Sequence, residues 1–145
     1  MKLCFFLTFC IGIVISANGG ASANGMVVQT QIIMRCKAPM NDEVQVMLME
    51  RDLGGSLIDE DETFDYGKYY LNKVPEQRLL LQGGDFELSG LEPYLFIIHS
   101  CTNQSNTVKR LEVDLMEGMY KSRFFDVIID LDTMKHTIKD TLISP

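Results

Sequence analysis

The chain of 145 residues has no tryptophan, two histidines and few basic side chains, with 13 lysines and arginines against 20 aspartates and glutamates. The formal net charge of −7 argues against nucleic-acid binding, because affinity for nucleic acid comes mainly from neutralising phosphates with Lys and Arg. With two histidines, the chain has few side chains that could act as the base in nucleophilic catalysis, which needs a nucleophile held beside an oriented base. Long charge blocks are absent too, so the composition is that of one globular domain.

The N-terminal segment is strongly apolar and differs from the rest of the chain. Lys2 is followed by about a dozen apolar residues, and small residues then recur up to Ala23. This pattern is typical of a secretory signal peptide, and the apolar run is shorter than the roughly 20 residues of a membrane-spanning helix. We therefore expect residues 1–23 to be a signal peptide, cleaved between residues 17 and 23. The mature domain, residues 24–145, is expected to be secreted and to have no transmembrane anchor.

Cysteine is scarce in this mature domain. Cleavage would remove Cys4 and Cys10 and leave Cys36 and Cys101. It would also remove Lys2 and no acidic residue, which takes the net charge from −7 to −8. In an oxidising compartment, Cys36 and Cys101 are the disulfide candidates, and a monomer can form at most one bridge from them. A domain of this length can bury enough surface to fold without it.

Strict alternation of side chains is clearest in residues 44–52. One face carries Val44, Val46 and Leu48, and the other carries Gln45, Met47 and Met49. This two-residue period is typical of a half-buried strand. A β-branched segment, residues 27–34, comes before it, with turn-forming residues in between. We expect these two segments to pair as an antiparallel hairpin.

Other short apolar segments predict the remaining strands. Residues 94–101 form a nearly continuous apolar run that should be a central strand. Further β-prone segments are residues 110–115, 124–131 and 137–143. About seven strands without a long helical period predict an all-β fold, an antiparallel β-sandwich. A short helix is expected only at Pro75, which can occupy a first helical turn.

The expected core follows from the alternating and fully apolar faces of these segments. The side chains expected between the two sheets are Val44, Val46, Leu48, Leu95, Ile97, Leu111, Val113 and Ile129. In the weaker last segment, Ile138 and Leu142 are the inward candidates.

Four motifs and their order resemble a known family. They are Val44-x-Val46-x-Leu48-x-Glu50-x-Asp52, Asp59-Glu60, Gly84-x-Phe86-Glu87-Leu88-Ser89-Gly90 and Glu92-Pro93-Tyr94-Leu95-x-Ile97-x-His99-x-Cys101. The last is the most specific, because a strand that starts at proline ends in His-x-Cys. It is followed by Lys109-Arg110 and Phe125-Asp126. Together, over most of residues 27–131, these motifs resemble the nematode transthyretin-like family.

The resemblance implies a secreted, transthyretin-like (immunoglobulin-like) β-sandwich. It further implies a non-enzymatic binding protein for an extracellular protein or a small lipophilic ligand, with no cofactor. One family member bridges exposed phosphatidylserine on dying cells to an engulfment receptor, so a bridging adaptor of this kind is the alternative function. A hydroxyisourate hydrolase-like enzyme is a weaker alternative, because that branch of the fold ends in Tyr-Arg-Gly-Ser, whereas this chain ends in Ile143-Ser144-Pro145.

The chain departs from the family pattern in its cysteines and in its middle. Cysteines that many members carry before Lys109 and near the C-terminus are missing, so Cys36 and Cys101 could bridge, pair between chains or stay free. A Gly-x-aromatic-x-Leu pattern also occurs twice, starting at Gly67 and at Gly84. One copy is surplus to the family spacing.

Residues 68–83 therefore look like an insertion, either a translated retained intron, which is slightly favoured, or a lineage-specific loop. A duplicated strand would have no edge to pair with, and its tyrosines and leucines would have no core face. A true insertion should form a partly helical excursion from Pro75 that packs on the sandwich through Leu79, Leu80 and Leu81.

The sequence also contains two weak motifs for binding or modification sites. Asp59-x-Asp61-x-Thr63-x-Asp65 places oxygen ligands at alternate positions, but Phe64 stands where an EF-hand needs glycine and Tyr70 where it needs an acid. Asp59, Asp61 and Asp65 are thus only weak calcium candidates. Asn103-Gln104-Ser105 is an acceptor sequon, which makes Asn103 a glycosylation candidate. We expect His99 to be a structural residue, and we predict no catalytic residue.

Overall fold

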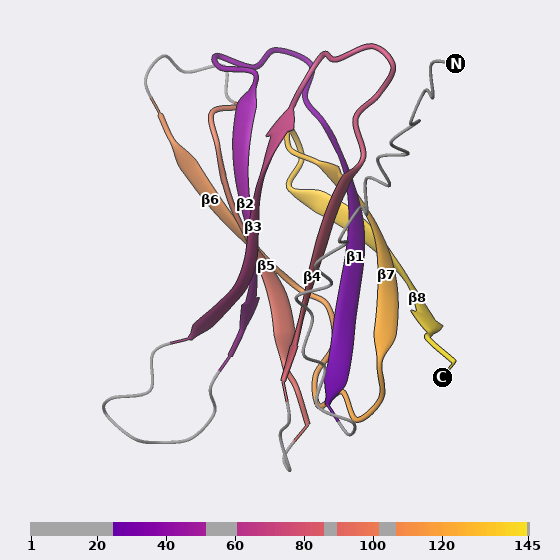
Figure 1. Ribbon diagram of the computed structural model, residues 1–145. Coiled ribbons are helices and arrows are strands. Elements are labelled where there is room, and N and C mark those ends of the chain that lie inside the picture. The colour runs from indigo at the N-terminus through magenta and orange to yellow at the C-terminus, as the bar shows by residue number, and fades with distance from the viewer. Residues whose placement is uncertain (1–24, 52–60, 86–89, 102–106, 145) are drawn as a thin grey trace, which may run out of the picture.

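A computed structural model describes residues 25–51, 61–85, 90–101 and 107–144 of the chain. In this part the chain forms strands that face one another in two layers (Figure 1). The strands are β1 (Met26–Arg35), β2 (Glu43–Glu50), β3 (Glu62–Tyr70), β4 (Leu79–Asp85), β5 (Pro93–His99), β6 (Lys109–Asp114), β7 (Arg123–Asp130) and β8 (Lys135–Leu142).

The eight strands form two four-stranded sheets, with the orders β4-β1-β7-β8 and β3-β2-β5-β6. All neighbours pair antiparallel except β1 and β7, which are parallel. The predicted β-sandwich is therefore confirmed, with eight strands in place of about seven. The apolar run before Cys101 forms β5, an inner strand as expected.

The predicted hairpin between residues 27–34 and residues 44–52 is wrong. β1 pairs with β4 and β7, whereas β2 pairs with β3 and β5, so the two strands belong to opposite sheets. Both strands are apolar enough to be inner strands, and they lie in opposite layers of the sandwich instead of side by side. The turn-forming residues between them carry the chain from one sheet to the other, where Pro39 bridges to Cys101.

The core lies between the sheets and contains the predicted side chains. Seven are buried, namely Val44, Val46, Leu48, Leu95, Ile97, Val113 and Ile129. Leu111 and Ile138 are partly buried and pack against this cluster. Leu142 is 50% exposed, because it ends the edge strand β8, so its prediction as an inward residue is wrong.

Residues 68–83 are built into both sheets, so the physical case for a surplus segment is wrong. They complete β3 and form most of β4, which pairs along its length with β1. Tyr69 and Leu81 are buried in the core. The two strands also approach so closely that a Cβ on Gly83 would overlap the side chain of Phe64, and one on Gly67 would lie 2.7 Å from Leu79 Cδ1.

The predicted helix at Pro75 is also wrong, since the described residues contain no helix. Gln77 closes a turn instead, because its Oε1 accepts a hydrogen bond from Tyr70 N (2.7 Å) and its Nε2 donates to Lys68 O (3.2 Å). The leucines that follow have the period of a strand. Leu81 points into the core, whereas Leu80 is 66% exposed on the outer face.

Cys36 and Cys101 form a disulfide within the chain, with Sγ atoms 2.04 Å apart. Cys36 follows β1 and Cys101 comes two residues after β5, so the bridge joins the two sheets at one end of the sandwich. Of the three alternatives for these cysteines, the structure has the intrachain bridge.

Candidate functional site

The solvent-facing side of the β3-β2-β5-β6 sheet carries a row of apolar side chains. Because side chains alternate across a strand, the residues between the buried ones of β2 and β5 point outward. The strand register places Met47 between Tyr66 and Phe96 in one row across three strands. Met49 and Ile98 lie one row away, on opposite sides of this row. We call Met47, Met49, Tyr66, Phe96 and Ile98 the apolar outer face.

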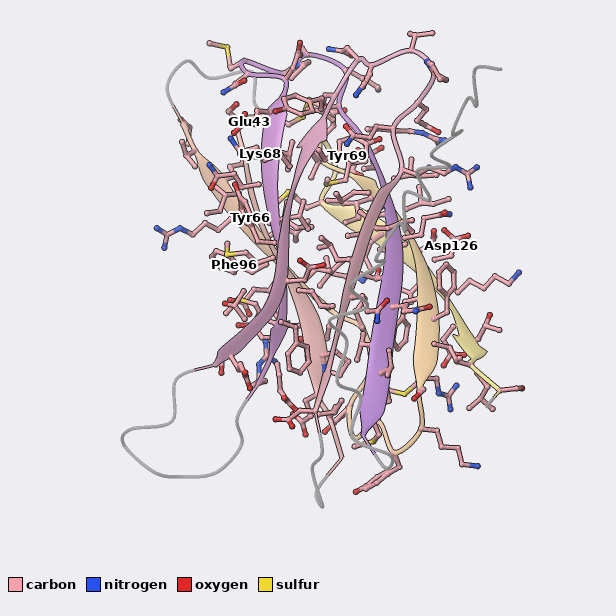
Figure 2. The ribbon with its side chains drawn as sticks, viewed as in Figure 1. Glu43, Tyr66, Lys68, Tyr69, Phe96 and Asp126 are labelled. Atoms are coloured by element: carbon pink, nitrogen blue, oxygen red, sulfur yellow. A yellow bond between two sulfur atoms is a disulfide. The ribbon has the colours of Figure 1, made fainter. Side chains whose placement is uncertain are left out.

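These five side chains lie at the surface. Tyr66 is 49% exposed, and the other four are partly exposed. Figure 2 shows Tyr66 and Phe96 on the same side of the molecule, with Asp126 of the other sheet on the opposite side. Exposed apolar patches rimmed by polar groups mark interaction sites, and methionine and aromatic residues are enriched in interface cores. The arrangement can therefore bind a complementary apolar surface.

One end of the apolar outer face is basic. Lys68 pairs with Gln45 on β2, and Arg110 pairs with Ile98 on β5, so both point outward at this end. Lys68 Nζ forms an ion pair with Glu43 Oε1 at 2.8 Å, and this hydrogen bond raises the pKa of Lys68. Figure 2 shows Glu43 and Lys68 close together at the end of the sheet. Arg110 is exposed and has no ion pair with any described residue.

The other end of the face is acidic, and its side chains are linked by ion pairs and a hydrogen bond. Arg51 lies 4.7 Å from the ring centroid of Tyr94 and forms ion pairs of 3.1 Å with both Glu112 and Asp114. Tyr94 in turn donates a hydrogen bond of 2.6 Å from its hydroxyl to Asp61 Oδ2. Burial and this hydrogen bond raise the pKa of Tyr94, so the phenol stays a donor at physiological pH. Asp61 and Asp114 against one guanidinium leave this end net negative, while Glu112 lies one row nearer the centre, opposite Phe96.

The weak calcium candidates are held by different partners. Asp59 lies outside the described residues. Asp61 accepts from Tyr94, whereas Asp65 accepts from Tyr66 N (2.8 Å) and from Gln82 N (2.9 Å). The latter bond links the edges of the two sheets, so Asp65 already serves the contact between β3 and β4.

The structure brings together another acidic group that the sequence did not indicate. Among the described residues, oxygen atoms of Glu50, Glu62 and Asp85 lie within 4.8 Å of one another. They come from β2, β3 and β4, so the folding of the chain is needed to assemble them. Carboxylate oxygens are ligands that Ca²⁺ takes, but an acidic group alone does not define a site.

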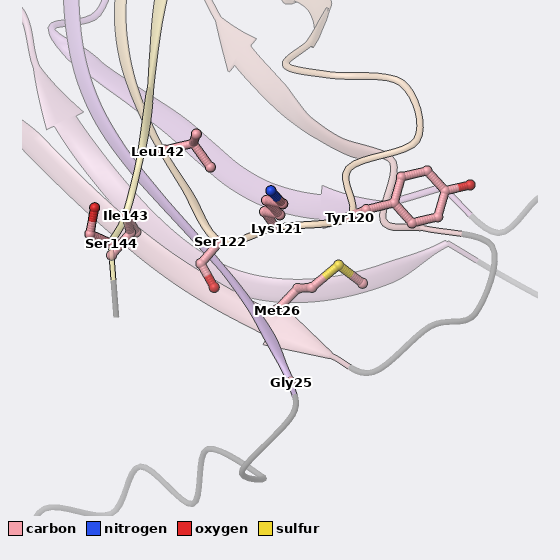
Figure 3. A pocket seen from close by; sticks show the side chains of 8 residues that line it. All are labelled: Gly25, Met26, Tyr120, Lys121, Ser122, Leu142, Ile143 and Ser144. Atoms are coloured by element: carbon pink, nitrogen blue, oxygen red, sulfur yellow. The ribbon is translucent and has the colours of Figure 1, made fainter.

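A pocket of about 580 Å³ is lined by the start of β1, by the residues before β7 and by the end of β8 (Figure 3). Its apolar lining includes Met26, Tyr120, Leu142 and Ile143. Ser122 fixes this region, because its hydroxyl accepts from Val27 N and its carbonyl from Ile143 N, both at 3.0 Å. The volume is within the range of small-molecule sites.

His99 is buried at the end of β5 that carries the disulfide. Its Nδ1 accepts a hydrogen bond of 3.2 Å from Cys101 N, which holds the backbone beside the bridge. Burial, together with the charge of Lys109, lowers the pKa of His99. The glycosylation candidate Asn103 and the predicted signal peptide lie outside the described residues.

Sequence reasoning missed the apolar outer face, although a signal for it was present. Met47 and Met49 occupy the face of β2 that a half-buried strand turns to water, where polar residues are usual. Tyr66 and Phe96 could not be added to them without the register of β2 against β3 and β5.

No protein-family model matches the chain, and no curated protein matches it. Among solved structures, it is similar to a "putative cell adhesion protein" from Bacteroides ovatus ATCC 8483, with a TM-score of 0.40 and 10% sequence identity. The similarity covers 84% of this chain and 46% of that one, so the chain spans about half the length of this neighbour. Within the described residues, no helix has the length and apolar character needed to cross a membrane.

Proposed function

We propose that the chain is an extracellular, non-enzymatic binding protein that recognises another protein through its apolar outer face. The observation that carries this proposal is the row of Tyr66, Met47 and Phe96 across three neighbouring strands, turned to solvent. Core packing does not explain these residues, because they point away from the core. Covering them with a partner would remove apolar surface from water, which is the main favourable term in protein association.

The disulfide supports the extracellular setting of the proposal, because such bonds persist in oxidising compartments. The N-terminal apolar segment supports it independently, as a predicted signal peptide. Mass spectrometry of the protein recovered from culture medium tests this setting. We expect a first residue between positions 18 and 24. Recovery only from the cell fraction, with residues 1–23 still attached, would contradict secretion.

Photo-crosslinking tests the binding surface. Benzoylphenylalanine replaces Tyr66 in one version of the protein and Ile128 in a control version. Ile128 is 38% exposed on the outer face of the other sheet, so it offers a comparable apolar position. In extracellular fluid from its source, we expect covalent adducts from position 66 and few from position 128. Equal adduct yields from the two positions, or none from position 66, would contradict the proposal.

A small lipophilic ligand is the second candidate, favoured by the pocket between Met26 and Leu142. The probe is 8-anilinonaphthalene-1-sulfonate, a fluorescent apolar anion. If this pocket binds lipophilic molecules, Leu142→Glu should abolish the fluorescence gain and Phe96→Glu should preserve it. The reverse result would assign the dye to the apolar outer face and remove the pocket from consideration.

A further inference from the structure

We infer that the partner of the apolar outer face is a second copy of this chain, bound face to face with its strands running in the opposite direction. This inference rests on the proposed function, because it names the occupant of the same surface. The charges around the apolar residues are arranged so that the face is complementary to itself.

The charges divide the face along its strands. On β6, Arg110 and Asp114 both point outward, and they are four residues apart, which is roughly 13 Å in a strand. On the side of β3, Lys68 lies at the same end as Arg110, and Asp61 lies at the end of Asp114, where it binds Tyr94. The apolar outer face lies between the two ends.

A two-fold axis can lie in the plane of the face and run perpendicular to the strands. It then places each end of the face against the opposite end of the face in the second copy. Arg110 of one copy then faces Asp114 of the other, and Lys68 faces Asp61. Each of these contacts occurs twice, as a closed two-fold interface requires. A two-fold axis parallel to the strands would instead place Lys68 against Arg110, so the charges select one of the two arrangements.

The centre of the face fits this arrangement. The axis runs along the row of Tyr66, Met47 and Phe96, so each of these side chains meets its own counterpart in the second copy. Methionine suits such a position because its flexible thioether adapts to an irregular surface. Glu112 ends the same row, and Arg51 already compensates its charge at 3.1 Å. Two sheets can pack face to face in this way at about 10 Å.

Charge reversal tests the inference, with the association constant measured by sedimentation equilibrium. Arg110→Glu places like charges together twice in the dimer, and so does Asp114→Lys. Each variant alone should weaken dimerisation by about tenfold or more. A mixture of the two variants restores opposite charges at both contacts, and we expect it to form a heterodimer about as tight as the wild-type dimer.

The mixture also controls for folding, because a misfolded variant cannot regain association from its partner. Leu80→Glu is the matched surface control, since Leu80 is exposed on the outer face of the other sheet and should have no effect. Wild-type dimerisation that is insensitive to both charge reversals, or that is lost with Leu80→Glu, would overturn the inference.

The proposed function can survive the failure of this inference. If the wild-type protein stays monomeric at every concentration, while crosslinks from position 66 have the mass of the chain plus a different protein, the second copy is wrong and the binding face stands. If neither dimer nor crosslink forms, both fail.

Discussion

The two sheets of the sandwich have the same number of strands and a shared core, yet their outer faces differ. In the β4-β1-β7-β8 sheet, the outer face of the inner strands is mixed: it carries the polar Gln29, Gln31 and Asp126 and the apolar Val27, Ile33, Phe124 and Ile128. In the β3-β2-β5-β6 sheet, the inner strands present the two methionines, Phe96 and Ile98 of the apolar outer face. The fold fixes which side chains point outward in each sheet and leaves their chemistry free.

The mixed outer face of the β4-β1-β7-β8 sheet satisfies part of its own hydrogen-bonding capacity. Gln29 Nε2 donates to Gln82 Oε1 at 3.0 Å, and Gln31 Nε2 donates to Asp126 Oδ1 at 3.4 Å, so these side chains bind along the sheet. Apolar side chains have no such option and gain only when a second surface covers them. The polar side chains of the first face are thus paired within the sheet, whereas the row of Tyr66, Met47 and Phe96 gains only when a partner covers it.

Loss of the disulfide should have the largest effect on stability, because the bridge joins the two sheets. Cys36 and Cys101 are 65 residues apart, and closing a loop of that length contributes about 4 kcal/mol in the chain-entropy description. We expect Cys36→Ala with Cys101→Ala to lower the free energy of unfolding by this amount in urea denaturation. A loss below about 1 kcal/mol would show that the sheets hold together without the bridge.

Adjacent residues of β5 separate the core from the outer face. Ile97 is fully buried, whereas Phe96 points to solvent. Ile97→Ala should cost roughly 2 to 5 kcal/mol, as core truncations do. Phe96→Ala should cost about 1 kcal/mol or less and should act mainly on association. Equal losses of unfolding free energy in chemical denaturation would contradict this assignment, since they would place both side chains in the core.

The close contact of β3 with β4 should be sensitive to a single methyl group. Gly83→Ala introduces a Cβ that overlaps Phe64, and overpacking of this kind costs typically 1–3 kcal/mol. Phe64→Gly in the same chain removes the Cβ as well as the ring that the new methyl group would meet, so it should recover part of the loss, and a double-mutant cycle by urea denaturation measures the coupling. Strictly additive losses would mean that the two residues do not touch.

The smallest effect concerns pH. Burial lowers the pKa of His99 in the folded state below its ordinary value of 6.5. As the pH falls below 6.5, the unfolded state takes up a proton that the folded state resists, so stability is complete above that pH and decreases toward the lowered pKa. His99→Gln should flatten this part of the stability profile. An unchanged profile for His99→Gln would contradict the buried neutral imidazole.

Local patterns predicted the strands but not their partners. The alternation in residues 44–52 and the apolar run of β5 reported burial correctly, because burial of a strand face depends on its own sequence. Pairing depends on the other strands of the fold, and β1 pairs with β4 and β7 and not with β2. The family spacing misled the interpretation of residues 68–83, because the fit of Gly83 under Phe64 exists only in the folded sandwich.

The candidate site was predictable only in part for the same reason. Met47 and Met49 are outward by alternation alone, whereas Tyr66 and Phe96 join them through pairing across three strands. The charges at the two ends were scattered in the sequence between Arg51 and Asp114, and only the register gathers them around one face.

Methionine oxidation by peroxide tests most directly whether the apolar outer face is the binding surface. Met47 and Met49 lie on the face, and Met40, 56% exposed in the connection between β1 and β2, serves as an internal reference in the same molecule. Oxidation follows exposure, so the ratio of Met47 to Met40 oxidation reports whether the face is covered. We expect this ratio to fall severalfold from dilute buffer to the extracellular fluid in which the protein occurs. An unchanged ratio would contradict the account.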